Sequence, residues 1–340
     1  MKNLSLSFKD LFSKNAISKP QKDHKTTPLQ VLIHKETAMH IRSWRFIILI
    51  GLVGLTFLAS MYVSLSNLKG SLSNLQDPDR AFVYLKLLTV TDNSLPPFHI
   101  FLGFLAPLLG ISLGFDAINA EQNGGTLSRL IAQPIYRDNL LLAKFLSPML
   151  IVSILFSALA LLMLGTGLIL TGIRIDLQEV LRIFSFVALS ILYVSFWLSL
   201  SILLSIRFKQ AATSALMAIG IWLFFTIFYP IVVNLTIRSF LPDPNTLSPQ
   251  QWVTYNDLIL NWLRISPSQL YTDATTTLLM PSVRSLGPVT MEQMARAIPA
   301  PLPLKESIMI VWPQLSGMIA ATMVCFALAY ASFMRREVRG

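Results

Sequence analysis

The chain has 340 residues, of which 54% are hydrophobic and only 13% are charged. Soluble domains carry about 25% charged residues, so this composition excludes an ordinary soluble protein and indicates an integral membrane protein. The net charge of +10 does not require a nucleic-acid partner, because Lys and Arg in membrane chains mark the cytoplasmic side. The single cysteine, Cys325, excludes a disulfide framework or a cysteine-rich metal site.

The first 45 residues form a basic segment that ends in a predicted helix. Thr27-Pro28-Leu29-Gln30 is a capping box with proline in the first helical turn, which predicts a helix start. Apolar residues then recur beside Lys and Arg, and Trp44 stands where a headgroup-level anchor is expected. We expect an interfacial helix in the cytoplasmic leaflet; a plain juxtamembrane helix without a partner is the alternative.

Six apolar stretches follow, each near or above the ~20 residues that cross the hydrocarbon core. They cover residues 46–65, 98–115, 145–172, 183–206, 211–234 and 307–333. Because six is even, both termini are expected on one side. The predicted fold class is therefore an all-α membrane protein with six transmembrane helices. The predicted domains are a cytoplasmic segment (1–45), a six-span transmembrane domain (46–334) and a cytoplasmic C-terminus (335–340).

Residues 116–144, between the second and third spans, form an unusually polar hairpin. Asn123-Gly124-Gly125 predicts a helix stop, because glycine adopts the left-handed backbone that such stops often need. Thr126 is expected to cap a short helix that ends before Pro134. This helix would present Leu127 and Leu130 beside Arg129, and the next helix is expected to start near residue 138 or 139.

Two loops on the other side carry helix signals of their own. Residues 66–97 contain Asp77-Pro78, a helix start. Residues 235–306 contain three capping-box patterns, which begin at Ser248, Ser266 and Thr290. Trp252, Tyr255, Ile259 and Trp262 share one face of the first predicted helix. We expect a helical extracytoplasmic insert whose aromatic stripe packs on its own core or on the membrane. Docking of an extracytoplasmic partner or cargo is the alternative.

The distribution of charge predicts the orientation. The N-terminal segment, the 116–144 hairpin, residues 207–209 and the C-terminus hold seventeen Lys and Arg against seven acids. The other three loops hold ten of each kind. Under the positive-inside rule the first set faces the cytoplasm, together with both termini.

The predicted spans contain no Asp, Glu, Lys or Arg, and their one histidine is His99, at the rim of the second. This argues against an ion-coupled carrier or an intramembrane hydrolase, which need ionisable groups in the membrane. The four histidines are too scattered to suggest a metal site. The sequence also lacks a G-x-x-x-x-G-K-[ST] phosphate loop. We therefore expect no catalytic residue and no cofactor in this chain, and an energy source in a separate subunit.

The hairpin resembles a known family. Its series Glu121…Gly125-Thr126-Leu127…Pro134…Arg137…Lys144 is similar to the E-x-x-x-G-T-L…P-x-x-R…K signature of ABC-2-type permeases. It looks most like the branch of nitrous-oxide-reductase maturation and gliding-machinery permeases. The resemblance is strong over about 30 residues and looser over most of the chain.

This resemblance implies a coupling helix that fits a groove in a separate ATP-binding subunit, present in two copies and holding ATP with magnesium. It also implies a dimer with a second permease copy or a paralogue, and transport, most simply export, across the cell membrane. The residues expected to contact the ATPase are Glu121, Gly124, Gly125, Thr126, Leu127, Arg129, Leu130, Pro134 and Arg137.

Simpler interpretations remain open at this point. The hairpin could be a solvated turn in which Glu121 pairs with Arg129. Arg137 and Lys144 could be positive-inside anchors, which for Lys144 is the favoured interpretation. The chain could also be a non-transporting scaffold or mechanotransmitter that moves an extracytoplasmic partner through residues 235–306.

Overall fold

The computed structural model describes residues 27–71, 82–90, 95–127, 136–240, 248–281 and 302–335, and every regular element among them is a helix. Five elements form the first part: α1 (Pro28–Ile41), α2 (Trp44–Ser71), α3 (Val83–Thr89), α4 (Phe98–Gly114) and α5 (Asn119–Asn123). Then follow α7 (Arg137–Thr171), α8 (Leu177–Arg207), α9 (Ala211–Leu223), a π-helical turn η1 (Phe224–Phe228) and α10 (Tyr229–Phe240). The last are α11 (Pro249–Leu263), α12 (Pro267–Leu279) and α14 (Leu304–Met334).

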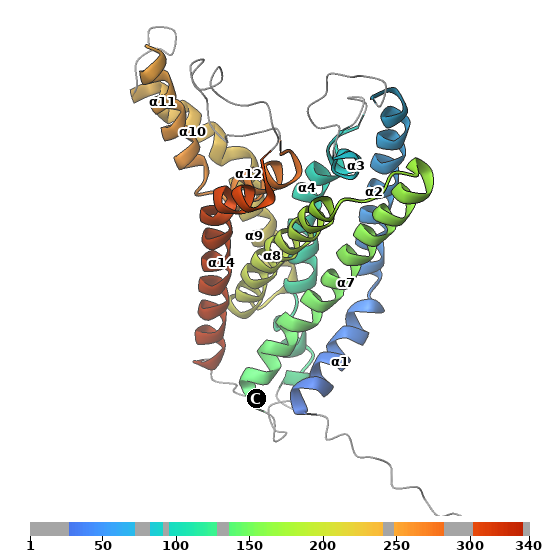
Figure 1. Ribbon diagram of the computed structural model, residues 1–340. Coiled ribbons are helices and arrows are strands. Elements are labelled where there is room, and N and C mark those ends of the chain that lie inside the picture. Colours follow the sequence, from blue (N-terminus) through green and yellow to red (C-terminus); the bar gives the residue numbers. More distant parts are fainter. Residues whose placement is uncertain are drawn as a thin grey trace, which may run out of the picture.

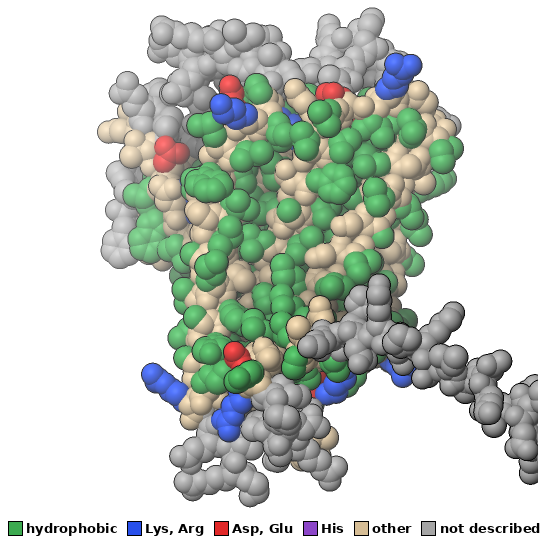
Figure 2. Space-filling view, turned by 60° about the horizontal axis from the view of Figure 1, so that its bottom comes forward, with side chains coloured by type: hydrophobic (Ala, Val, Ile, Leu, Met, Phe, Trp, Pro, Cys, Tyr) green, Lys and Arg blue, Asp and Glu red, His purple; other side chains and the backbone are tan. Residues whose placement is uncertain are grey.

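Six segments of the described chain are long and apolar enough to cross a membrane. They are Trp44–Ser66, Phe98–Asn123, Arg137–Thr171, Leu177–Arg207, Ala211–Ile237 and Leu304–Met334. Each overlaps one predicted span, so the all-α, six-span prediction is confirmed. Hydrophobic side chains cover the middle of the bundle, and Lys and Arg gather toward its two ends (Figure 2). The chain is therefore a multi-pass membrane protein.

Helix α8 forms the centre of the bundle. It packs against α4, α7, α9, α12 and α14, and its buried face includes Trp197, Leu198 and Ile202. Two glycines of α4 allow α4 and α8 to approach each other closely. A Cβ atom on Gly110 would lie 2.7 Å from the carbonyl oxygen of Val194, and one on Gly114 would lie 2.9 Å from that of Leu198. This i, i+4 pair of small residues lets two membrane helices pack backbone against backbone.

The two ends of the bundle differ (Figure 1). α1, the start of α7 and the end of α14 lie at one end, which we call the hairpin end. α3, α10, α11 and α12 lie at the other, which we call the insert end. Predicted helix starts at the insert end are partly confirmed. The side chains of Ser248 and Gln251 form the reciprocal capping box of α11.

Ser266 precedes α12 as predicted, but its hydroxyl bonds the carbonyl of Phe225 instead of capping the helix. The predicted starts at Asp77 and Thr290 lie outside the described residues.

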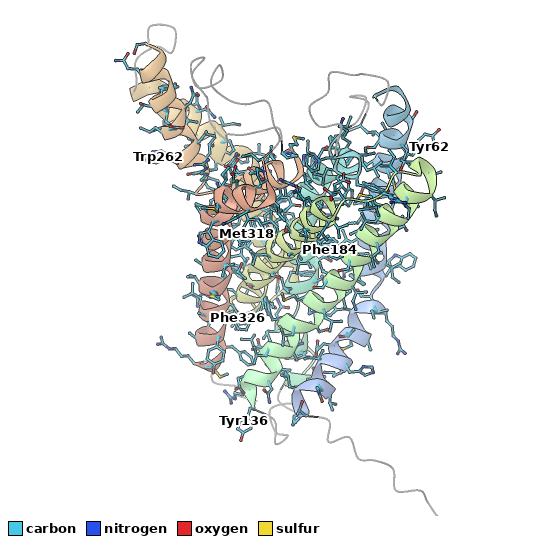
Figure 3. All side chains as sticks on the ribbon, in the orientation of Figure 1. Tyr62, Tyr136, Phe184, Trp262, Met318 and Phe326 are labelled. Carbon is cyan, nitrogen blue, oxygen red and sulfur yellow. The ribbon has the colours of Figure 1, made fainter. Side chains whose placement is uncertain are left out.

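The predicted aromatic stripe of α11 is divided between two environments. Tyr255 is buried with Val233 and Ile237 of α10, and Ile259 packs against the same cluster. Trp262 is 52% exposed and points away from the bundle (Figure 3). The α10–α11 hairpin therefore has a small core of its own, as expected of a helical insert, and also an exposed apolar face. Nothing is described of the side chain of Trp252.

Candidate functional site

Helix α1 starts where the sequence predicts. The amide of Gln30 donates to Thr27 Oγ1 (3.4 Å), the amide of Thr27 donates to Gln30 Oε1 (3.1 Å), and Pro28 occupies the first turn. Trp44, the first residue of α2, is 73% exposed, which suits an anchor residue. The helix packs along α7 with Leu32 and Glu36 buried. The capping box is confirmed, and the packing on α7 is a contact that the sequence did not predict.

A hydroxyl pair joins α1 to α7. Thr37 Oγ1 donates to the carbonyl of Ile33 (2.7 Å) and lies 2.9 Å from Ser147 Oγ. Because the single proton of Thr37 is already used, Ser147 is the donor in the second contact. The first half of α7 and the second half of α1 are thereby fixed to each other.

The entry to the hairpin is fixed to α8. Ser205 Oγ accepts the amides of Ile118 (2.9 Å) and Asn119 (3.2 Å), and Asn123 Nδ2 donates to the carbonyl of Lys209 (2.9 Å). α5 ends at Asn123, Gly124 is its C-cap residue, and Gly125 has a φ of +66°. The predicted glycine stop is confirmed, and its left-handed residue is the second glycine.

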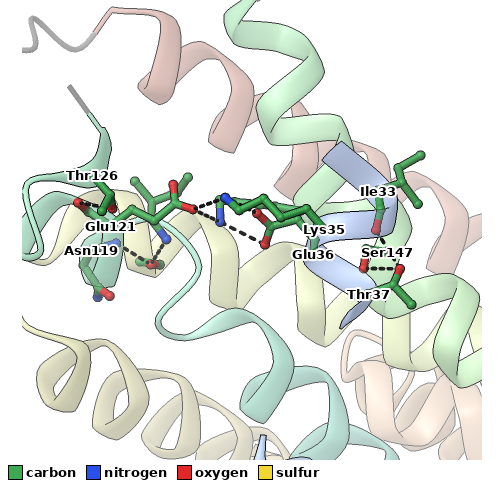
Figure 4. A network of polar contacts seen from close by, with 11 residues as sticks. Ile33, Lys35, Glu36, Thr37, Asn119, Glu121, Thr126 and Ser147 are labelled. Atoms are coloured by element: carbon green, nitrogen blue, oxygen red, sulfur yellow. Dashed lines mark hydrogen bonds and ion pairs between the residues drawn. The ribbon is translucent and has the colours of Figure 1, made fainter. Parts of the chain in front are cut away.

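Four charged side chains meet between these elements, and we call them the ionic quartet: Lys35 and Glu36 of α1, Glu121 of α5 and Lys144 of α7 (Figure 4). Lys144 Nζ lies 2.9 Å from Glu121 Oε1 and 3.2 Å from Glu36 Oε2. The side chains of Lys144 and Glu36 are only 4% and 3% exposed. A buried charge requires a close partner of opposite sign, and each of these has one. The quartet therefore joins α1, α5 and α7.

An open hollow of about 510 Å³ borders the quartet. Its lining also includes His40, Arg45 and Asp116, of which Arg45 and Asp116 pair at 2.7 Å. Burial lowers the pKa of His40 below its ordinary value; nearby Lys144 adds to this effect, and Glu36 and Asp116 oppose it. His40 is therefore neutral at pH 7, and the lysines and arginine of the lining are matched by three carboxylates. This balance argues against an anion-binding site.

The structure places the predicted coupling residues as follows. The hydroxyl of Thr126 donates back to the carbonyl of Glu121 (3.1 Å), and the amides that it was expected to cap lie outside the described residues. Leu127 is 3% exposed and belongs to the hydrophobic core of this chain, so it holds the hairpin against the bundle. Gly124 and Gly125 form the turn, and Arg137 is the first residue of α7, one residue earlier than expected. Arg129, Leu130 and Pro134 lie outside the described residues.

One interpretation from the sequence needs correction, and another is not tested. Glu121 pairs with Lys144 and Lys35, and its suggested partner Arg129 lies outside the described residues. Lys144 is not a solvated anchor, because it is buried between two carboxylates. Glu36 and Ser205 were missed altogether. Their partners lie 86 to 108 residues away in sequence, and no local spacing signals such a contact.

Among the residues for which a structure is given, no group of three or more His, Cys, Asp or Glu side chains could hold a metal ion. The charged side chains that line the hollow instead neutralise one another. What the arrangement can do is mechanical: it can transmit a displacement of the hairpin to the helices on either side.

A multi-pass helical membrane protein with a polar hairpin between its second and third spans is the class defined by this fold and site. The family model of the ABC-2 family transporter protein matches residues 30–338, so the chain belongs to the ABC-2 transporter family. It is also similar to the probable ABC transporter permease protein NosY of Pseudomonas aeruginosa, with 33% identity over 175 residues.

That alignment covers 49% of this chain and 58% of the relative. The probable ABC transporter permease protein NosY of Stutzerimonas stutzeri is 28% identical over 239 residues, which are 68% of this chain and 76% of the relative.

Proposed function

We propose that this chain is the membrane-spanning permease subunit of an ABC transporter, and that it acts as an exporter in the cell membrane. It dimerises with itself or with a paralogue, and two copies of a separate ATP-binding subunit dock on the hairpin end. Family membership and the permeases named above support this role. ATP and magnesium are held by the partner subunit.

The observation that carries the proposal is the attachment of the hairpin. Its entry is bonded to α8 through Ser205, and Glu121 is bonded to α1 and α7 through the ionic quartet. A displacement applied near residues 126–132 therefore reaches the central helix α8 and the α1–α7 pair together. A solvated turn would not need a buried ionic connection of this kind.

The proposed cycle follows from these attachments. ATP-driven closure of the two ATP-binding subunits pushes the hairpins, which tilts the second and third spans of each permease. The contact between the two permeases then changes, and the pathway opens to the other side. The ATP-binding subunits face the cytoplasm, because this end of the chain carries the excess of Lys and Arg.

The proposal is tested with Leu130→Asp. If Leu130 packs in a groove of the ATP-binding subunit, its burial contributes about 1.5–3 kcal/mol, and aspartate would also place a charge in that groove. We expect co-purification with the ATP-binding subunit and permease-stimulated ATP hydrolysis to fall together, with membrane insertion unchanged.

The matched control is Leu177→Asp, which makes the same change at a 69% exposed leucine at the insert end. This variant should keep both activities. Wild-type complex formation and ATP hydrolysis in Leu130→Asp would show that the hairpin is only a solvated turn.

One observation favours a second candidate, a mechanotransmitter without cargo. The α10–α11 hairpin extends from the insert end (Figure 1), and Leu258 and Trp262 are 39% and 52% exposed. An extracytoplasmic partner bound there could be moved by the same hairpin mechanics. If this candidate is correct, deleting residues 241–265 would abolish function and leave permease-stimulated ATP hydrolysis unchanged.

A further inference from the structure

The ionic quartet contains two lysines that face the same carboxylate oxygen. Lys144 Nζ is 2.9 Å from Glu121 Oε1, and Lys35 Nζ is 3.8 Å from that atom. Glu36 is placed in the same way, with Oε2 at 3.2 Å from Lys144 and Oε1 at 3.5 Å from Lys35. The Lys144 contacts are hydrogen bonds, and the Lys35 contacts are ion pairs at longer distance. Each glutamate thus has one close and one more distant cation.

The quartet also has unused acceptors. Glu36 Oε1 and Glu121 Oε2 are buried and make no hydrogen bond. A buried oxygen without a donor is unfavourable, so a movement that brings a donor closer is favoured locally. The cation that faces Glu36 Oε1 is Lys35, and a shift of less than one ångström would complete that hydrogen bond.

The two lysines differ in freedom. Lys144 is 4% exposed on α7, one turn from the Ser147–Thr37 contact that fixes α7 to α1. Lys35 is 42% exposed, and its charge is carried on a flexible four-carbon stem. Arg45, the other cation on this side of the hollow, is already paired with Asp116. Among the described cations that line the hollow, Lys35 is therefore the one that can follow Glu121 if α5 moves.

We propose that Glu121 has two positions, one paired with Lys144 as in this structure and one paired with Lys35 after the hairpin has moved. Lys35 is then a positioning residue for the coupling movement. Without it, separation of Glu121 from Lys144 would leave a carboxylate in the hollow without a partner, which is strongly disfavoured. This inference rests on the proposed function, since a moving hairpin requires a docked ATP-binding subunit.

The test uses the complete complex of permease and ATP-binding subunits in lipid nanodiscs. Lys35→Met removes the charge but keeps most of the stem, Lys35→Arg retains the charge, and Lys305→Met is the matched control at the insert end. Spin labels replace Gln122 and His34, both exposed, in a Cys325→Ser background. Pulsed electron paramagnetic resonance then measures the distance between α5 and α1 with and without ATP and magnesium.

We expect the label distance in the unsubstituted complex to change when ATP and magnesium are added. In Lys35→Met the nucleotide-free distance and complex formation should be unchanged, the ATP-induced change should be lost, and permease-stimulated hydrolysis should fall about tenfold. Lys35→Arg should restore both readouts, and Lys305→Met should leave both unchanged. A purely structural role for Lys35 would instead alter the nucleotide-free distance.

Two failures are distinguishable. If the complex assembles and hydrolysis is stimulated, but the Lys35→Met distance changes as in the unsubstituted protein, the two-position inference is wrong and the proposed function stands. If the ATP-binding subunit does not associate with the hairpin end at all, the proposed function fails and the inference fails with it.

Discussion

Two glycines of this chain have the same backbone conformation at opposite ends of the bundle. Gly125 in the hairpin and Gly172 at the end of α7 both have a φ of +66°, and neither has a heavy atom near the place of a Cβ. A side chain at either position meets no clash with neighbours and only the intrinsic strain of left-handed backbone. That strain is about 1–2 kcal/mol for residues other than glycine. Comparing the two positions therefore separates the effect of backbone strain from the effect of lying in the hairpin.

Gly125→Ala and Gly172→Ala should lower the free energy of unfolding by similar amounts, on the order of 1–2 kcal/mol each. Only Gly125→Ala should also reduce permease-stimulated ATP hydrolysis, because only Gly125 lies in the proposed coupling hairpin. Both quantities are measured on the purified complex in the same lipid. Equal hydrolysis in the two variants would argue against a special role for the hairpin turn.

Lys144 shows what the sequence does and does not reveal at this scale. Its position in the family-like series is visible, and so is the glycine stop that precedes it. Its burial is not visible, because it depends on Glu36, which lies 108 residues earlier on another helix. Local patterns predict turns and caps, whereas a buried ion pair between distant elements is decided by tertiary packing.

At the scale of elements, the backbones of α4 and α8 approach closely at Gly110 and Gly114. Alanine at Gly110 or Gly114 would place its Cβ within 3 Å of the α8 backbone, which cannot move aside as a flexible side chain can. Gly54 of α2 has open space at the same position, and alanine there also has the better helix propensity.

Gly110→Ala and Gly114→Ala should each destabilise the protein by about 1–3 kcal/mol through overpacking. Gly54→Ala should be neutral or slightly stabilising. Thermal unfolding of each variant in detergent, followed by the loss of monodisperse protein, gives the comparison. If Gly110→Ala matched Gly54→Ala, the close packing of α4 on α8 would be wrong.

Helix starts were the most predictable part of the elements. The capping boxes at Thr27 and Ser248 form as the local pattern predicts. Ser266 marks the right start for α12 with a different bond, because the carbonyl of Phe225 is within its reach. Gln269, its expected partner, donates instead to Asp273 at 2.7 Å. The local sequence pattern therefore predicts where α12 starts, but the hydrogen-bond partners of Ser266 and Gln269 depend on the surrounding structure.

At the scale of the whole molecule, the two ends of the bundle carry different charge. The segments at the hairpin end hold an excess of ten Lys and Arg over acids, and those at the insert end are balanced. This difference was predictable from the sequence alone because it depends only on counting residues between spans. It also gives the proposed orientation a direct test.

In a Cys325→Ser background, cysteines introduced at Arg129 and Val338 should be protected from a membrane-impermeant thiol reagent in intact cells. A cysteine introduced at Asn245 should be labelled. Permeabilised cells provide the control, in which all three should react. Labelling at position 129 from outside would invert the orientation and remove the basis for docking an ATP-binding subunit there.

The π-helical turn η1 (Phe224–Phe228) in the fifth span has a consequence for the insert beyond it. Such a turn accommodates one extra residue in an α-helix. Deleting one residue from it would restore regular α-helix and rotate everything that follows by about 100°. The hydroxyl of Ser266 would lose the carbonyl of Phe225, which lies within the turn. Tyr229 and the carbonyl of Trp262 both follow the turn, so they would rotate together and keep their hydrogen bond. The direction in which the α10–α11 hairpin faces is therefore set by a single residue inside the membrane.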